Sequence, residues 1–562
     1  SCSSAMAAAT RSLRACAPAR TYWLQALQPI ADGHRAWIDS DKMPERKLLM
    51  SASTNAIFGN RLLIACVAVA SIAGGATPAR SQLSAASLPV DQTTRYKGEE
   101  YLLIGDAVRG AGEPVIAINP KNPDNIIVGA MANLHYVEGS PFGATQAPVG
   151  PDTILKYRNT PEASISRYAI SEDRGRTWRH IEDPFRHHFD MNGTADAFVG
   201  AAPDGTLFMG SMSFFPRNAS PEILAQEREP EPALLFGGTT LTWSQDQGRT
   251  WNHPPVMVMG LDTPIQEYGP GLKPLRKLTT PFDRPYLVSD LSTGTIYVPG
   301  TGLGGDPPRR QTFVRASKDN GKTWGLIYSF DSPLYPQSAF GAGRPAAAHG
   351  VLGVTYIASS APSVSTGKCP CLIFGASRDE GRTFERHVVR TGLPADKGFE
   401  EGMGPPVLPM VAADPSRAGR FAVMLPAADE SSLLVLVTDD YGKTWKGPVR
   451  AGGTRGTKTT KPDITYSPRG ELALVWLAVN PDHSYAAWSS VSHDGGLRFS
   501  PSLKVSRSAS PPRSAIRFRG NNWDGDDLSS LAVDNEFVHL VWADGRSGFL
   551  GAWYARIPLS SY

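Results

Sequence analysis

The chain has 562 residues, of which 19% are charged, and its formal net charge is +3. A balance so close to zero provides neither the basic surface that binds nucleic acid nor an acidic tail. Glycine (55 residues) and proline (47 residues) are abundant, which favours many short strands joined by turns over long helices. We therefore expect an all-β protein that has no nucleic-acid partner.

The N-terminal part has the composition of segments that precede a folded domain. Residues 1–49 are rich in alanine, arginine and serine, and we expect a disordered or non-native extension there. Residues 50–82 resemble a secretory signal, with Arg61, an apolar run over 62–73 and small residues after it. This run is shorter than the roughly 20 residues that span a bilayer. We expect a secreted or periplasmic protein without a stable membrane span after cleavage, with a linker over 83–98 and one domain over 99–562.

One short phrase occurs six times along that domain, as SEDRGRTW, SQDQGRTW, SKDNGKTW, SRDEGRTF, TDDYGKTW and SHDGGLRF. Its aspartates are Asp173, Asp246, Asp319, Asp379, Asp440 and Asp494. They recur about every 54 to 73 residues, the length of one four-stranded sheet with its loops. The aspartate can accept backbone N–H groups, the glycine can adopt positive φ, and the closing aromatic ring can pack between sheets. Because six equivalent turns around a ring cannot converge on one substrate, we interpret these aspartates as structural.

Seven segments resemble the first strand of such a unit. They begin near Glu113, Ala195, Asp283, Gly343, Pro405, Thr460 and Asp526. The seventh unit has no copy of the phrase, and we expect the strand near Glu99 to complete it, because joining both chain ends removes an exposed edge. The sequence predicts a seven-bladed β-propeller of four-stranded antiparallel blades, with six blades as the alternative.

Cys369 and Cys371 are the cysteines that follow the signal-like segment. A Cys-Pro-Cys spacing closes a very short ring, so a disulfide there would stabilise little through chain entropy. No second cysteine pair accompanies it to make a metal site. The two residues form either a local staple or a pair of free thiols.

The repeated phrase resembles the Asp-box, or BNR repeat, of sialidases and of non-enzymatic propellers. Together with DRPYLVSD and VHLVWADGR, it makes the stretch from about residue 99 to 558 similar to the bacterial sialidase-like propellers. The resemblance implies a site with three arginines for the substrate carboxylate, a tyrosine paired with a glutamate as nucleophile, and an aspartate as acid/base. The Asp-boxes themselves lie away from that site.

This chain contains only part of the set of site residues that the resemblance implies. Glu113 stands where the first arginine is expected. Arginine before proline on an inner strand occurs at Arg284 and Arg344, with Lys461 as a third cation. These three are the predicted substrate-binding residues. The predicted catalytic residues are Asp196 and Glu400 as acid/base candidates and Tyr286 as nucleophile. No glutamate partner of Tyr286 is identified.

The segment NNWDGDD near the seventh blade contains Asp524 and Asp526, which imitate the start of a calcium loop. The glycine and the glutamate that such a loop needs are absent at their positions. We therefore predict no cofactor or metal and keep these two residues as weak calcium ligands.

Two functions remain open. The first is an exported sialidase-like propeller that binds, or also hydrolyses, an anionic glycan through Arg284 and Arg344. The second is a non-catalytic propeller that binds protein or polysaccharide through long insertions at 137–161, 215–232 and 262–280. An enzyme of the first kind would be a glycoside hydrolase of sialidase type.

Overall fold

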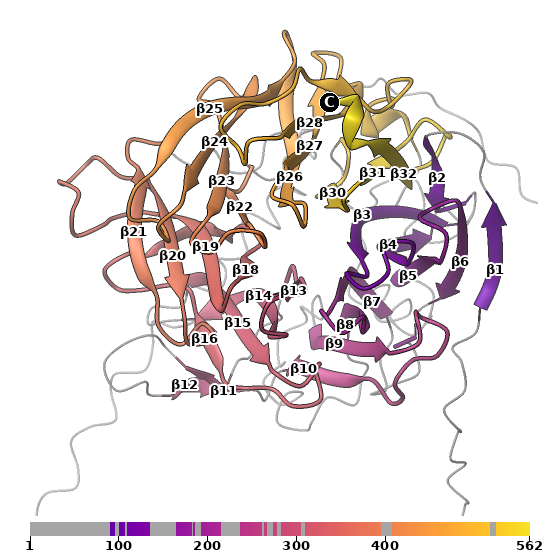
Figure 1. The fold of residues 1–562 in the computed structure, drawn as a ribbon, viewed down its shortest axis with the longest axis horizontal. Coiled ribbons are helices and arrows are strands. Elements are labelled where there is room, and N and C mark those ends of the chain that lie inside the picture. The colour runs from indigo at the N-terminus through magenta and orange to yellow at the C-terminus, as the bar shows by residue number, and fades with distance from the viewer. Residues whose placement is uncertain are drawn as a thin grey trace, which may run out of the picture. The chain divides into compact units, whose positions relative to one another are not determined.

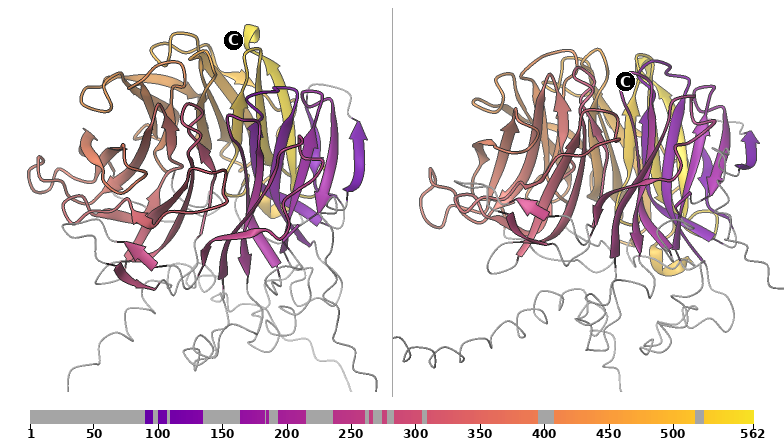
Figure 2. Two further views of the ribbon diagram at one scale, coloured as in Figure 1. Left: turned by 60° about the horizontal axis from the view of Figure 1, so that its bottom comes forward. Right: turned by 90° about the horizontal axis from the view of Figure 1, so that it is seen from below.

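The structure is a computed structural model that describes residues 90–95, 100–106, 109–134, 164–182, 184–185, 193–214, 236–260, 264–266, 274–277, 283–304, 309–394, 407–516 and 524–562. All of them lie in the compact unit Ser84–Tyr562. Seven sheets are arranged around a ring, and their strands run along its axis (Figures 1 and 2). The predicted seven-bladed propeller is confirmed, and the six-bladed alternative is wrong.

The first three blades follow the chain in order. From the centre outwards their strands are β3 (Arg109–Ile118), β4 (Ile126–Leu134), β5 (Ser164–Ser171) and β6 (Thr177–Glu182); β7 (Gly193–Ala201), β8 (Leu207–Phe214), β9 (Phe236–Ser244) and β10 (Val256–Gly260); and β13 (Val288–Ser289), β14 (Ile296–Gly304), β15 (Arg309–Ser317) and β16 (Ile327–Ser329). Three further strands extend two of these sheets at the outer edge: β1 (Val90–Arg95) pairs with β6, and β11 (Pro264–Gln266) and β12 (Pro274–Lys277) lie beyond β16. Strand β1 lies within the stretch expected to be a linker.

Blades four to six repeat the pattern. Their strands are β17 (Gln337–Ala342) and β18 (Ala346–Ala348) beside β19 (Val351–Ala358), β20 (Cys371–Ser377) and β21 (Glu385–Arg390); β22 (Met410–Ala413), β23 (Phe421–Pro426), β24 (Ser432–Thr438) and β25 (Lys446–Gly453); and β26 (Lys458–Tyr466), β27 (Leu472–Val479), β28 (Tyr485–Ser492) and β29 (Leu503–Lys504). Every residue of β20 and β27 is buried. These strands are apolar on both faces because a neighbouring blade covers each side.

The seventh blade joins the two ends of the domain. It consists of β30 (Ser530–Val533), β31 (Phe537–Asp544), β32 (Gly551–Pro558) and, as its outer strand, β2 (Glu100–Ile104). The predicted donation of an N-terminal strand to this blade is confirmed. Glu100 also forms an ion pair with Arg546 at 2.7 Å, which fixes β2 to the loop between β31 and β32.

Two single turns of 3₁₀-helix, η1 (Arg513–Ala515) and η2 (Leu559–Ser561), complete the described elements. None of the described segments forms a helix that is long and apolar enough to cross a membrane. Cys369 and Cys371 are joined by a disulfide, which is the local staple of the two alternatives.

The six copies of the repeated phrase form the same turn. In the copy around Asp319, Ser317 donates to Oδ1, Thr323 donates its backbone N–H to Oδ1 at 2.8 Å and its hydroxyl to Oδ2 at 2.6 Å, and Gly321 N–H donates to the serine hydroxyl. The sixth copy has Arg498 in place of the threonine, and its guanidinium donates to Asp494 Oδ2 at 2.8 Å instead. Each aspartate is therefore occupied within its own turn.

The glycine of each turn has a second role. A Cβ at Gly442 would lie 2.4 Å from the ring of Phe374 in the preceding blade, and one at Gly175 would lie 2.1 Å from the Tyr554 hydroxyl oxygen. The glycines of the other four copies meet the blade before them in the same way. Glycine is thus needed both for positive φ and for close approach between blades.

The aromatic residue that closes each phrase also packs against another blade, as predicted. Trp178 of the first blade lies edge-on to Tyr554 of the seventh, with ring centroids 5.0 Å apart. Trp445 of the fifth blade meets Phe374 of the fourth at 5.4 Å in the same orientation. The repeated turn therefore fastens one blade to the previous one around the ring.

Candidate functional site

Five blades place a charged residue in the left-handed backbone region on the chain that forms or leads into their innermost strand. The φ angles are 50° for Glu113, 44° for Asp196, 55° for Arg284, 48° for Lys461 and 57° for Asp526. In β3, β7 and β26 the strand register shifts at this residue, as in a β-bulge. A non-glycine residue in this conformation costs about 1–3 kcal/mol, and such residues cluster at functional sites. Recurrence in five blades makes the ring centre the candidate site.

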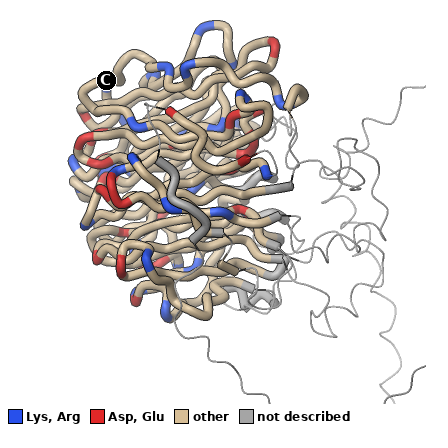
Figure 3. The backbone as a smooth tube through the Cα atoms, turned by 90° about the vertical axis from the view of Figure 1, so that its right-hand side faces the viewer, with Lys and Arg blue, Asp and Glu red and all other residues tan. Residues whose placement is uncertain are grey.

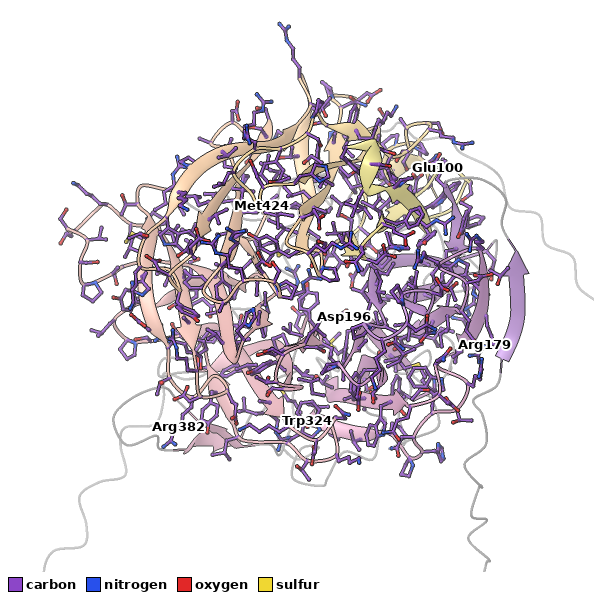
Figure 4. All side chains as sticks on the ribbon, in the orientation of Figure 1. Glu100, Arg179, Asp196, Trp324, Arg382 and Met424 are labelled. Atoms are coloured by element: carbon purple, nitrogen blue, oxygen red, sulfur yellow. A yellow bond between two sulfur atoms is a disulfide. The ribbon has the colours of Figure 1, made fainter. Side chains whose placement is uncertain are left out.

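Four of these five residues line one small cavity. Its charged wall consists of those four, Glu113, Asp196, Arg284 and Lys461, and of Asp527, the neighbour of Asp526. Figure 4 shows Asp196 beside the ring centre. The remaining wall is mainly apolar, from Val115, Ala197, Pro285, Tyr286, Val407, Leu408, Met410, Pro462 and Leu528. The cavity volume is about 50 Å³, which suits a few waters or the polar groups of a larger ligand, since one water needs about 10–15 Å³.

Arg284 links two carboxyl groups of this wall. Its backbone N–H donates to Asp196 Oδ2 at 3.0 Å, and its guanidinium Nη2 lies 3.1 Å from Asp527 Oδ2. Burial and the charge of Asp283 raise the pKa of Asp196 to about 7. The guanidinium of Arg284 also fixes the position of the Asp527 carboxylate. A carboxyl group whose pKa is close to neutral therefore shares the cavity with one that is paired with a guanidinium.

A second group of carboxylates lies at the junction of the first and seventh blades. One oxygen each from Glu113, Asp526 and Asp527 lie within 4.8 Å of one another. Burial, followed by the charges of Asp196, Asp527 and Asp526, raises the pKa of Glu113 well above its usual value. A Cβ at Gly112 would lie 1.6 Å from Asp526 Oδ2, so only glycine lets this carboxylate reach Glu113.

Lys461 supplies the second cation of the wall. Its side chain is buried, and burial lowers its pKa to about 8, against the opposing effect of Asp527. Its backbone carbonyl accepts a hydrogen bond from the Ser529 hydroxyl, which ties the sixth blade to the seventh.

Arg344, predicted to bind substrate beside Arg284, has a different environment. Its Nη2 lies 2.7 Å from Asp463 Oδ1 and 3.3 Å from the carbonyl of Ile464. Asp463 in turn accepts the backbone N–H groups of Ile464 at 2.8 Å and Leu531 at 3.3 Å. Arg344 thus joins the fourth blade to the sixth within a hydrogen-bonded network, and it is not among the described residues that line the cavity.

Tyr286 lines the cavity, but its surroundings do not activate it. Burial raises the pKa of its phenol well above the usual value. Among the residues that the structure describes, no carboxylate is hydrogen-bonded to its hydroxyl. A tyrosine nucleophile needs a neighbouring base to take its proton, so this environment disfavours the nucleophilic role predicted for Tyr286.

Asp524, predicted as a weak calcium ligand, does not line the cavity. Glu400 lies outside the described residues. Asp524 accepts the backbone N–H of Arg513 at 2.6 Å and contacts His483 Nδ1 at 2.8 Å. These partners use both oxygens of Asp524, so the imitation of a calcium loop by Asp524 and Asp526 is not supported by geometry. Oxygens close enough to share a cation are instead those of Glu113, Asp526 and Asp527.

Asp527 was missed by sequence reasoning, although the acidic segment that contains it was noticed. The available signal was Glu113, an acid at the position where the resemblance implies a cation. Charges of both signs are interspersed over the side of the domain shown in Figure 3.

Fold and cavity together define a seven-bladed propeller with a carboxyl-rich site at its centre. No family model and no curated protein matches the chain. Similar solved structures include a protein of unknown function from Dyadobacter fermentans, with 13% identity over 83% of this chain and 98% of that one and a TM-score of 0.43. The Hadza microbial sialidase Hz136 has 13% identity over 83% and 97% and a TM-score of 0.38. A Penicillium chrysogenum alpha-L-arabinanase has 14% identity over 65% and 94% and a TM-score of 0.35.

Proposed function

We propose that the protein is a glycoside hydrolase whose reaction takes place at the central cavity, with Asp196 as proton donor and Asp527 as the second carboxylate. Most glycosidases use one carboxylic acid that protonates the leaving oxygen and one carboxylate that acts as base or nucleophile. The single observation that carries the proposal is the link through Arg284, whose backbone holds Asp196 and whose side chain holds Asp527.

The two carboxyl groups have the environments that these roles require. A proton donor works best with a pKa near the operating pH, and the pKa of Asp196 is raised to about 7. The guanidinium of Arg284 holds Asp527 at 3.1 Å, which fixes the position of the carboxylate that acts as base or nucleophile.

This proposal keeps the glycosidase chemistry expected from the resemblance and changes its residues. The nucleophile is a carboxylate in place of Tyr286. The alternative of a non-catalytic propeller depends on the insertions at 137–161, 215–232 and 262–280, which lie mainly outside the described residues, and no observation favours it. The signal-like segment at 50–82 supports action outside the cytoplasm, which N-terminal sequencing of the mature protein would test.

The experiment is a hydrolysis assay with a panel of fluorogenic aryl glycosides and the full chain. Asp196→Asn is expected to lower kcat about 100- to 10,000-fold on the substrate cleaved best, the usual contribution of a general acid. Asp527→Asn is expected to be similarly slow. Asp429→Asn, at an exposed turn where the carboxylate accepts hydrogen bonds from the backbone N–H and the hydroxyl of Ser431, is the matched control. Wild-type kcat in folded Asp196→Asn would refute the assignment.

A further inference from the structure

We infer that the central cavity accepts an uncharged, hydroxyl-rich sugar, and that Arg284 and Arg344 hold the blades and the carboxyl groups in place instead of binding a ligand carboxylate. The inference deepens the proposed function, on whose cavity it rests, by naming the substrate class. It departs from the anionic glycan that the arginine-proline pattern suggested.

Arg284 already has a carboxylate from the protein. Its guanidinium is paired with Asp527 at 3.1 Å across the ring, and the two side chains are 23% and 15% exposed. A ligand carboxylate that approached Nη2 of Arg284 would compete with Asp527 for this donor. Separating a largely buried pair leaves a charge without its partner, which is strongly unfavourable. Arg284 is therefore poorly suited to recognise an anion and well suited to position Asp196 and Asp527.

Arg344 is also paired with a carboxylate of the protein. Asp463, its partner at 2.7 Å, is only 5% exposed and accepts two backbone N–H groups besides. A bidentate clamp on a ligand carboxylate needs two free donors on one edge of the guanidinium. Nη2 of Arg344 instead donates to both Asp463 and the Ile464 carbonyl, so this end of the side chain faces protein.

The polar groups around the cavity suit hydroxyl groups. Three carboxyl groups, of Glu113, Asp196 and Asp527, line it together with two cations, Arg284 and Lys461. An oxygen of Asp526 lies within 4.8 Å of oxygens of Glu113 and Asp527. Burial raises the pKa of Glu113 and of Asp196, so these groups can donate hydrogen bonds as acids as well as accept them. Hydroxyl groups can donate hydrogen bonds to carboxylates and can also accept one from a protonated acid.

The apolar part of the cavity wall fits the C–H face of a sugar ring. Val115, Ala197, Leu408, Met410 and Leu528 supply apolar contacts, which complement the C–H face of a pyranose or furanose ring. Binding sites for small molecules commonly combine such an apolar lining with a few polar groups that fix orientation. The volume of about 50 Å³ accommodates the hydroxyl-bearing edge of a ring, with the remainder of the glycan towards the solvent.

The test is binding of the labelled full chain, carrying Asp196→Asn to prevent turnover, to an array of neutral, sialylated, uronate-containing and sulfated glycans. Signal for neutral glycans at least tenfold above that for their acidic counterparts is expected. Leu528→Trp, which fills the cavity, should remove the signal, whereas Leu291→Trp at an exposed position should not. Circular dichroism and thermal unfolding identify any variant that fails to fold.

Signal confined to sialylated, uronate or sulfated glycans would overturn the inference, as would an array without any signal. The result is separable from the proposed function. A chain that binds neutral glycans and cleaves none of them would refute the hydrolase and leave the ligand class standing. A chain that cleaves sialosides alone would refute the neutral ligand class and leave the hydrolase standing.

Discussion

The guanidinium of Arg284 in the third blade lies 3.1 Å from the carboxylate of Asp527 in the seventh. These residues come from opposite parts of the ring, so the pair acts as a tie across the centre. With Arg344 and Asp463, which join the fourth blade to the sixth, it connects blades that the sheets themselves do not connect. The centre of the ring is thus braced by charge as well as by the contacts between adjacent blades.

Arg284→Gln should destabilise the domain by about 1–3 kcal/mol, less than the loss of a fully buried pair because both side chains keep some exposure. Urea unfolding of the wild type and the variant measures the difference. Arg249→Gln is the matched control, since its pair with Glu172 joins side chains that are 62% and 35% exposed and should contribute at most about 1 kcal/mol. Equal losses of unfolding free energy in the two variants would show that the pair of Arg284 and Asp527 does not stabilise the ring.

Asp196 should make stability depend on pH in a predictable direction. Its pKa is raised to about 7 in the fold, whereas it is about 3.9 in an unfolded chain. Between these values the folded state binds more protons than the unfolded state, so stability falls as pH rises through this window. Asp196→Asn should reduce that fall, and urea unfolding at several pH values measures it. A titration of the Asp196 carboxyl carbon by NMR that gave an ordinary pKa would contradict the expectation.

Gly442→Ala should lower the free energy of unfolding more than Gly367→Ala. The two glycines have similar backbone conformations, but Gly367 has no neighbouring side chain in the described part of the chain. Gly442 has φ of +93° and Gly367 has φ of +84°, but only at Gly442 would the new Cβ meet another side chain, Phe374 of the preceding blade at 2.4 Å. The backbone strain of about 1–2 kcal/mol is common to both, and overpacking adds about 1–3 kcal/mol at Gly442. The difference in unfolding free energy between the two variants reports packing between blades, and a difference of zero would exclude it.

His539 should make closure of the ring sensitive to acid. Its Nδ1 lies 2.8 Å from the Tyr554 hydroxyl and its Nε2 lies 3.2 Å from Asp534, with Arg556 and Arg174 nearby. Burial lowers its pKa despite the opposing effect of Asp534. The unfolded chain therefore takes up a proton first, and stability falls as pH drops below about 6.5.

The measurement for His539 is unfolding by urea across that window, compared with His539→Gln, which should show a weaker dependence on pH. The pKa of Asp534 is also lowered in the fold. The stability that it contributes is lost in a separate, more acidic window, as pH falls from its unfolded pKa towards its folded pKa. Parallel curves for the wild type and His539→Gln would assign the acid sensitivity to other groups.

Removal of strand β2 should prevent stable folding. Leu103 and Ile104 on this strand are 3% and 1% exposed, and its hydrogen bonds cover the edge of β32. Each buried side chain contributes about 2–5 kcal/mol, and the uncovered edge invites aggregation. A chain that starts at residue 97 should remain monomeric in size-exclusion chromatography, whereas one that starts at residue 105 should aggregate. Both lack β1, so β2 alone is compared.

The sequence predicted the architecture because the turn chemistry that specifies it is local. The side chains that form each turn lie within one phrase of eight residues, so their hydrogen bonds could be expected from spacing alone. The outer strand of the seventh blade could also be inferred, since one unit lacked both a phrase and a fourth strand. The further role of Gly442 in contact between blades could not, because it depends on the side chain of Phe374, 68 residues earlier.

The site was only partly predictable for a related reason. Asp196, Arg284 and Lys461 were identified from their positions at strand starts, and the structure brings them to one cavity with Tyr286. Their partners depend on ring closure, which places Asp527 against Arg284 and Asp463 against Arg344. No local pattern indicates which arginine will face a carboxylate that is more than 100 residues away. For this reason the pattern suggested an anion site where the structure has internal ion pairs.

The bulges at the ring centre also bear on how such a protein changes over time. The same backbone path carries glutamate, aspartate, arginine and lysine in different blades, so the path does not depend on which side chain it carries. A single codon change at one of these positions can therefore exchange an acid for a base at the cavity without rebuilding a loop. Aspartate and asparagine tolerate the left-handed region best among residues with a side chain, so Lys461→Asn, which removes a cation from the cavity, is an accessible step towards a new specificity.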